Sequence, residues 1–110
     1  MRLTVATAFL LASTQILAAA ALCPKYGECV PANRFECTDI SRSSFITRVC
    51  YAAPEQYMVI RLKRTDYHYC SIPHDVVKAL MSADSMGRYY NQNIKGGAYD
   101  CRDHPVPEFN

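Results

Sequence analysis

The sequence has almost no excess of either sign of charge. Its 110 residues contain 12 Lys and Arg against 10 Asp and Glu, a formal net charge of +2. Proteins that bind nucleic acid through its phosphates usually carry a clear net positive charge, because each contact neutralises a negative charge. The composition therefore argues against nucleic acid as a partner, and a protein partner is expected instead.

The spacings of common metal sites are also missing. The chain has three histidines and six cysteines, but no Cys-x-x-Cys or His-x-x-x-His pattern. Structural zinc sites are usually assembled from ligand pairs spaced in these ways. We therefore predict no bound metal and no cofactor.

One long apolar run is present, over residues 3–17. It is short for a membrane span and has no basic flank after it. With Arg2 in front and alanines at its end, it is typical of a secretory signal peptide. We predict that residues 1–21 are a signal peptide, cleaved between Ala19 and Leu22. The remaining chain would have no transmembrane anchor and would be exported, either periplasmic or secreted.

Every cysteine follows that segment. An even number of cysteines in a short exported chain predicts disulfides. Residues 22–42 show no helical or strand period, so we expect an irregular arm held by bridges, with Tyr26 and Phe35 as its packing anchors. The cysteines are Cys23, Cys29, Cys37, Cys50, Cys70 and Cys101.

The clearest patterns lie between residues 43 and 101. Alternation of apolar side chains predicts strands over 45–51, 57–63 and 67–71. The turn between the last two strands, over residues 63–66, contains no glycine, which is unusual for a tight hairpin. These strands predict a three-stranded antiparallel meander.

Helical spacing follows the meander. Pro73 and the apolar residues after it predict a helix over 74–83, and Ser85 can cap a second helix that ends before Gly96. The predicted fold class is α+β: the meander, two short helices on one of its faces, and a disulfide-tied N-terminal arm. Residues 99–101 are expected to return as a short edge strand, and 102–110 to form a flexible tail.

The strand register predicts an arrangement of the bridges. If Tyr51 lies opposite Met58 in the first hairpin and Ile60 lies opposite Tyr69 in the second, then Cys50 and Cys70 share one row on the face away from the helices. They would be about 10 Å apart, too far for a direct bond. We predict that the arm covers this face, that Cys50 and Cys70 each bond to an arm cysteine, and that Cys101 takes the third. The alternative is a local loop between the first two cysteines.

The third strand also carries candidate binding residues. Tyr67 and Tyr69 could stack on nucleic-acid bases, or they could fill the core with their hydroxyls at its edge. His68 alternates with them and is expected to face outward. A general base needs a nucleophile or an orienting group, and His68 has only Asp66 beside it on the same strand. We therefore predict that the chain is not an enzyme.

The second helix adds three polar residues. Arg88, Asn91 and Lys95 recur at about one helical turn. They could bind an anion or an acidic group of a partner, and the alternative is an ordinary solvated helix face. Together with His68 they make up the predicted binding surface.

Several short motifs follow one another along the chain. They are Ser43-Ser44-x-Ile46, Val49-x-Tyr51, Tyr67-x-Tyr69 with Ile72-Pro73, and Ser85-x-Gly87 followed by Tyr89-Tyr90-Asn91, Ile94, Gly96 and Tyr99. This order resembles the KTSC domain family, small bacterial domains also found at the C-terminus of some lysyl-tRNA synthetases.

The resemblance implies a KTSC-like domain over residues 43–101, in an exported version to which the cysteines and the arm are added. It also implies an unknown function, because the family is known mainly as a domain of unknown function. We predict a small exported, disulfide-stabilised binding or interaction module. The alternative is a nucleic-acid (RNA)-binding module, a role that has been suggested for the family.

Overall fold

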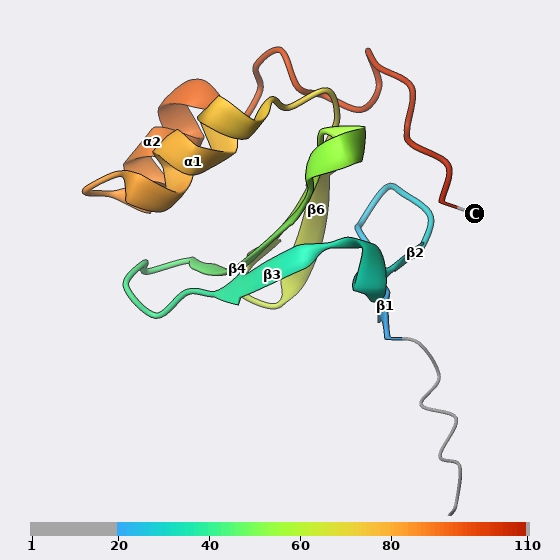
Figure 1. Cartoon of the computed structure of the whole chain (residues 1–110). Helices are drawn as coiled ribbons and strands as arrows, with labels where there is room; N and C mark the ends of the chain where they lie inside the picture. Colours follow the sequence, from blue (N-terminus) through green and yellow to red (C-terminus); the bar gives the residue numbers. More distant parts are fainter. Residues whose placement is uncertain (1–19, 110) are drawn as a thin grey trace, which may run out of the picture.

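The computed structural model describes residues 20–109, so the signal-peptide prediction falls almost entirely outside the described residues. The six strands come first and both α-helices follow them, as expected for an α+β fold (Figure 1). In chain order the elements are β1 (Ala21–Leu22), β2 (Val30–Pro31), η1 (Ala32–Arg34), β3 (Glu36–Asp39), β4 (Ile46–Ala52), η2 (Ala53–Glu55), β5 (Tyr57–Leu62), β6 (Thr65–Tyr69), α1 (His74–Ser82) and α2 (Met86–Asn93).

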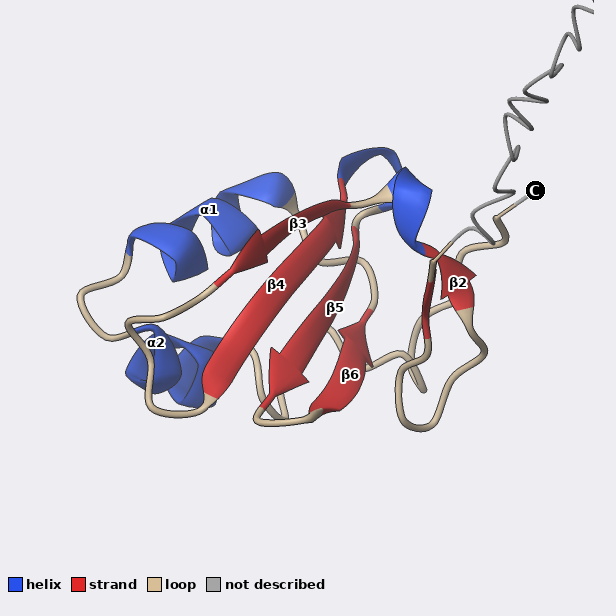
Figure 2. Ribbon diagram, turned by 90° about the horizontal axis from the view of Figure 1, so that it is seen from below, coloured by secondary structure: helices blue, strands red, loops and turns tan. Residues whose placement is uncertain are grey.

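The main sheet has four antiparallel strands in the order β3-β4-β5-β6 (Figure 2), and β1 pairs with β2 in a separate two-stranded sheet. The prediction of a three-stranded sheet is therefore wrong, although β4, β5 and β6 form the expected meander. Strand β3 was missed because all four of its side chains are exposed, which leaves no apolar alternation to detect. It is held by its pairing with β4 and by the disulfide between Cys37 and Cys50.

The two hairpins differ in how well the sequence predicted them. Tyr51 lies opposite Met58 in the first hairpin, as expected. In the second, Ile60 lies opposite Tyr67 rather than Tyr69, because the turn contains only two residues between paired Leu62 and Thr65. Lys63 takes a positive φ of 57° there without being glycine. A shift of two residues keeps every side chain on its predicted face.

The core between the sheet and the two helices contains most of the large apolar residues (Figure 1). Of the residues with the clearest apolar periodicity, those fully buried are Tyr51, Ile60, Ile72, Leu80, Tyr90 and Ile94, while Leu62 and Tyr69 are half-buried. The Tyr51 hydroxyl donates a hydrogen bond to the Ile72 carbonyl at 2.7 Å, which satisfies its one polar atom in the core.

Hydrogen bonds and close packing at their ends hold both helices in place. The Ser85 hydroxyl accepts a hydrogen bond from the Arg88 N–H, which confirms the predicted N-cap of α2. Arg42 donates to the carbonyls at the end of α1. Gly87 lets the Phe45 ring pack closely on α2, since a Cβ there would lie 2.5 Å from that ring and would push it aside.

A second, smaller core covers the other face of the sheet. Its buried residues are Leu22, Val30, Cys50, Tyr57, Val59 and Cys70. Phe35 packs against it as predicted, but Tyr26 is 83% exposed, so its predicted anchoring role is wrong. Residues 102–110, predicted as a flexible tail, have an anchor at Phe109, whose ring lies 5.5 Å from that of Phe35. The N-terminal arm and the tail therefore share this face.

All the cysteines are paired, as predicted. The bonds join Cys23 to Cys29, Cys37 to Cys50, and Cys70 to Cys101. Cys50 thus bonds to an arm cysteine and not to Cys70, as expected. The prediction that Cys70 and Cys101 bond to the arm is wrong, and the local loop of the first two cysteines is the one that forms.

The partner of Cys70 follows from the shorter hairpin turn. Strand β6 ends at Tyr69, so Cys70 lies just beyond the strand. Its N–H donates a hydrogen bond to the Tyr99 carbonyl at 2.8 Å, which brings Cys101 alongside. Residues 99–101 do not form the edge strand we predicted, and they are joined to the end of β6 by this hydrogen bond and by the Cys70–Cys101 disulfide.

Candidate functional site

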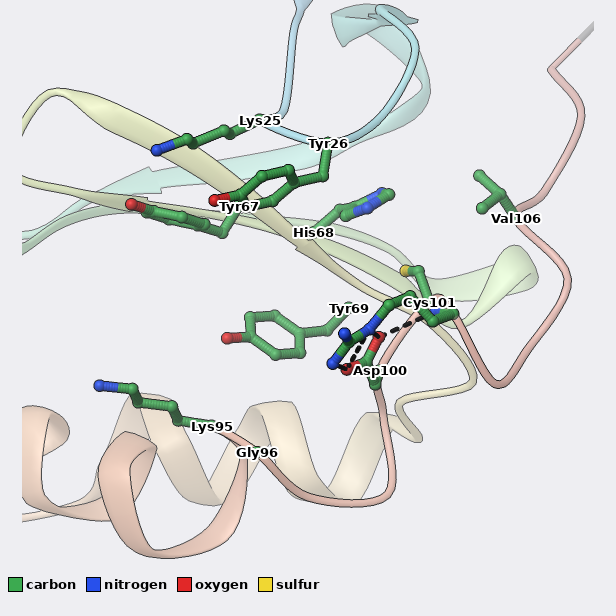
Figure 3. Close-up of a pocket in the computed structure, with 11 residues that line it drawn as sticks. Lys25, Tyr26, Tyr67, His68, Tyr69, Lys95, Gly96, Asp100, Cys101 and Val106 are labelled. Atoms are coloured by element: carbon green, nitrogen blue, oxygen red, sulfur yellow. Dashed lines mark hydrogen bonds and ion pairs between the residues drawn. The ribbon is translucent and has the colours of Figure 1, made fainter.

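An open pocket of about 690 Å³ lies along β6, an edge strand of the main sheet (Figure 3). Its lining comes from the N-terminal arm, from β6 and from the segment after α2. The lining residues are Lys25, Tyr26, Tyr67, His68, Tyr69, Lys95, Gly96, Asp100, Cys101, Arg102 and Val106. Three parts of the chain that are far apart in sequence thus meet at one edge.

The three β6 residues locate the pocket relative to the strand. Tyr67, His68 and Tyr69 are consecutive, so their side chains alternate between the two faces of the sheet. All three nevertheless line the same pocket. The pocket therefore lies at the open edge of β6 and can be reached by groups from both faces.

The two β6 tyrosines belong partly to the core. Both are half-buried and pack against the core beneath the helices. The Tyr69 hydroxyl lies 2.5 Å from the Tyr90 hydroxyl, and burial together with this hydrogen bond raises the pKa of Tyr69. This contact matches the predicted core role, in which a hydroxyl reaches a polar partner at the edge. The tyrosines serve as both core residues and pocket wall.

His68 is more enclosed than expected. Its Nδ1 lies 2.8 Å from the Tyr57 hydroxyl, and a Cβ on Gly27 of the arm would come within 2.7 Å of its ring. His68 lies on the face predicted for it, opposite Val59, but the arm covers that face, so the side chain is half-buried and not freely exposed. Burial raises the pKa of Tyr57 to about 12, so its hydroxyl stays protonated at neutral pH, and the His68 tautomer sets which of the two groups donates.

The burial of His68 predicts a dependence of stability on pH. Desolvation lowers the pKa of His68 from the ordinary value of 6.5, although the charge of Asp100 opposes it. The folded state then binds fewer protons than the unfolded state. We expect the contribution of His68 to the free energy of unfolding to be constant above about pH 6.5 and to fall as the pH drops from there towards the lowered pKa.

Urea unfolding at a series of pH values measures this effect. His68→Asn should remove the loss between pH 6.5 and the lowered pKa, while the matched change His74→Asn, at an exposed position on α1, should leave it in place. An identical pH profile for the parent and His68→Asn would contradict the assignment.

The charge of the pocket is mainly positive. Arg102 is paired with Asp100 at 2.7 Å, and its hydrogen bonds lower the pKa of that carboxyl to about 2. Lys25 and Lys95 are both exposed, and the ion pairs formed within residues 20–109 leave them out. In the view of Figure 3, Tyr69 lies between Lys25 and Lys95. The pocket can therefore attract a negatively charged group.

The KTSC domain family model matches residues 42–99. This chain belongs to the KTSC domain family. It is similar to the crystal structure of a KTSC domain protein from Yersinia pestis, with a TM-score of 0.52 and 28% identity over 56% of this chain and 87% of that one. It is also 48% identical over 33 residues to an uncharacterized protein of Stutzerimonas stutzeri (strain A1501). That match spans 30% of this chain and 46% of the relative, so the chain covers less than half of the relative's length.

The pocket combines the KTSC domain with residues outside the family match. Tyr67, His68, Tyr69, Lys95 and Gly96 come from the domain. The remaining lining residues come from the arm before it and from the segment after it. This KTSC protein thus builds a site that the domain would not make alone.

The structure divides the predicted binding surface. His68 and Lys95 both line the pocket of the KTSC protein, whereas Arg88 and Asn91 are exposed on α2 and do not line it. The reason is that α2 ends at Asn93, so Lys95 lies in the turn beyond the helix and not on its face.

Sequence reasoning missed the arm's contribution to the site. Lys25 and Tyr26 lie between two bonded cysteines, and Tyr26 has a positive φ of 71°. A basic and an aromatic residue inside a small disulfide loop were the available signal. Nothing local to that loop indicates that it packs beside β6. No group of three or more His, Cys, Asp or Glu suited to a metal occurs within residues 20–109.

Proposed function

We propose that this KTSC protein is a small exported, disulfide-stabilised binding module, and that the pocket beside β6 receives part of a partner protein. The observation that carries the proposal is the construction of the pocket. One wall is the edge of the KTSC sheet, and Lys95 and Gly96 also come from the domain. The rest of the lining lies outside the family match. It consists of a loop closed by the Cys23–Cys29 disulfide and of the segment after α2 that the Cys70–Cys101 disulfide ties to the end of β6. Additions that build a site beside a domain edge are more readily explained by recognition than by stability alone.

Export is part of the proposal. Three disulfides are consistent with an oxidising compartment, and within residues 20–109 no helix is long and apolar enough to cross a bilayer. Ala21 pairs with Pro31, and the Ala20 carbonyl accepts a hydrogen bond from the Ala32 N–H. Cleavage directly after Ala19 would keep this small sheet intact, and we propose that site within the predicted range.

A binding role also suits the chemistry of the pocket better than catalysis. The only histidine in the lining is His68, and its hydrogen-bond partner is Tyr57. A hydroxyl whose pKa is about 12 is almost fully protonated at neutral pH and is therefore a weak nucleophile. Asp100 is already paired with Arg102. We propose that the module has no enzyme activity of its own.

Site-specific photocrosslinking tests the proposal. A photoreactive amino acid would replace Lys95, which is exposed in the pocket, or Lys78, which is exposed on α1 and outside the pocket lining. The oxidised protein would then be irradiated in periplasmic extract and in culture medium. We expect discrete protein adducts from position 95 that are absent from position 78.

Two results would contradict the proposal. One is equal labelling from both positions, which would indicate non-specific contact. The other is adducts that disappear on nuclease treatment and weaken steeply with salt, which would favour the nucleic-acid alternative. Intact mass of the exported protein would in the same experiment show whether the chain begins at Ala20.

A further inference from the structure

The β6 edge is closed at both ends of the pocket. The Lys25 N–H donates to the Asp66 carbonyl at 2.7 Å, and the Cys70 N–H donates to the Tyr99 carbonyl at 2.8 Å. Both Asp66 and Cys70 therefore point their backbone polar groups away from β5. In an antiparallel strand every second residue points the same way.

His68 lies midway between these two residues and has the same orientation. In the strand register it lies opposite Val59, as Asp66 lies opposite Arg61. Its N–H and C=O must then also point off the sheet. Within residues 20–109, neither group has a backbone partner on that side. An edge strand with unpaired N–H and C=O groups is a template for a further strand.

The open stretch coincides with the pocket. Tyr67, His68 and Tyr69 all line it, and the closed positions lie one residue further on each side. From Asp66 to Cys70 the strand advances about 13 Å, at roughly 3.3 Å per residue. A segment of about four residues can lie along that length.

We propose that a short extended acidic peptide adds as a strand to β6 at His68. The peptide would accept a hydrogen bond from the His68 N–H and donate one to its carbonyl, which is the usual pattern of strand addition. Lys25 and Lys95 lie in the lining and can pair with its carboxylates. This inference rests on the proposed function and names the kind of partner segment that the pocket receives.

A peptide backbone fits the free N–H and C=O of His68 better than a nucleotide does. The donor and acceptor of His68 lie side by side, and an extended peptide backbone carries the same pair in complementary order. A phosphate backbone carries acceptors and would leave the His68 carbonyl unpaired. The two lysines favour negative charge on the peptide, so a sequence alternating acidic and apolar residues fits best.

Nuclear magnetic resonance on the complete mature protein, with its disulfides oxidised, tests the inference. The probe is a capped peptide of alternating glutamate and valine, about four residues long. Its two controls are a lysine–valine peptide and the acidic peptide with methylated backbone nitrogens. The acidic peptide should slow hydrogen exchange of the His68 amide and shift its resonance, and neither control should do so.

Charge variants give a second measure. Lys25→Ala with Lys95→Ala should weaken binding of the acidic peptide about five- to tenfold at low salt, because two partly exposed ion pairs are lost. The backbone N–H of residue 25 stays in place in this variant. Lys78→Ala, at an exposed position of α1, should leave the affinity unchanged.

The outcomes separate this inference from the proposed function. If photocrosslinking at position 95 gives protein adducts but the acidic peptide does not protect the His68 amide from exchange, strand addition is overturned. The proposal of a binding module is then still supported. Protection that grows with protein concentration alone would overturn it in favour of β6 pairing between two copies. Equal protection by the methylated peptide would show that backbone hydrogen bonds are not involved.

Discussion

Reduction of the three disulfides should unfold this protein under conditions in which the oxidised form is fully folded. The loops they close span 6, 13 and 31 residues. In the chain-entropy treatment these are worth roughly 2, 3 and 4 kcal/mol. A small domain is stable by only about 5–15 kcal/mol in total, so losing all three removes most of that.

The measurement is urea unfolding with and without a reductant, together with thiol titration in denaturant. The oxidised protein should show no free thiol. A midpoint that does not move on reduction, or a titre of several thiols before any reductant is added, would contradict the expectation.

The longest loop should matter most. Replacing Cys70 and Cys101 together by alanine should cost about 4 kcal/mol, against about 2 kcal/mol for Cys23 with Cys29. The 31-residue loop carries both helices and joins the end of β6 to the segment that lines the pocket. Equal losses for the two pairs would show that packing of the arm, and not loop closure, sets the contribution of the bridges.

Leu80→Ala should destabilise the protein by about 2–5 kcal/mol. Leu80 is fully buried on α1, in the core between the helices and the sheet. Truncation removes the buried apolar side chain and leaves a cavity, which the disulfide-bonded structure can fill only in part by relaxing. Urea unfolding of the oxidised protein measures the loss.

The matched control is Lys78→Ala, two residues earlier on the exposed face of the same helix. It should change the free energy of unfolding by no more than about 0.5 kcal/mol. If Leu80→Ala melts within about a degree of the parent, α1 does not pack on the sheet as described.

The motifs that carry the family resemblance are mostly explained by the fold. Tyr51 bonds to the Ile72 carbonyl, and Tyr69 bonds to Tyr90 across the core. Gly87 admits the Phe45 ring. These residues hold the sheet and helices together, so the family pattern identifies an architecture more than a binding site.

Local physical chemistry made much of the fold predictable. Alternation assigned the faces of β4 and β5 correctly, because one face of each strand packs under the helices and the other under the arm. Ser85 and the apolar spacing after it identified α2, since an N-cap and a buried stripe are both short-range features. A predicted signal peptide and an even number of cysteines were enough to predict that all six are bonded.

What depended on contacts between distant segments could not be read from the chain. The two-residue turn at Lys63 relies on a positive φ that no glycine signals. This short turn places Cys70 beyond the end of β6, beside Cys101, and not in the row across the sheet that we predicted. Strand β3 has only exposed side chains and exists through pairing and a bridge. The pocket was decided in the same way: β6 alone is a pattern of tyrosines, and it becomes one wall of a pocket only where Lys25 and Lys95 lie beside its edge. Packing between segments leaves no periodic trace in sequence, whereas strands and helices do.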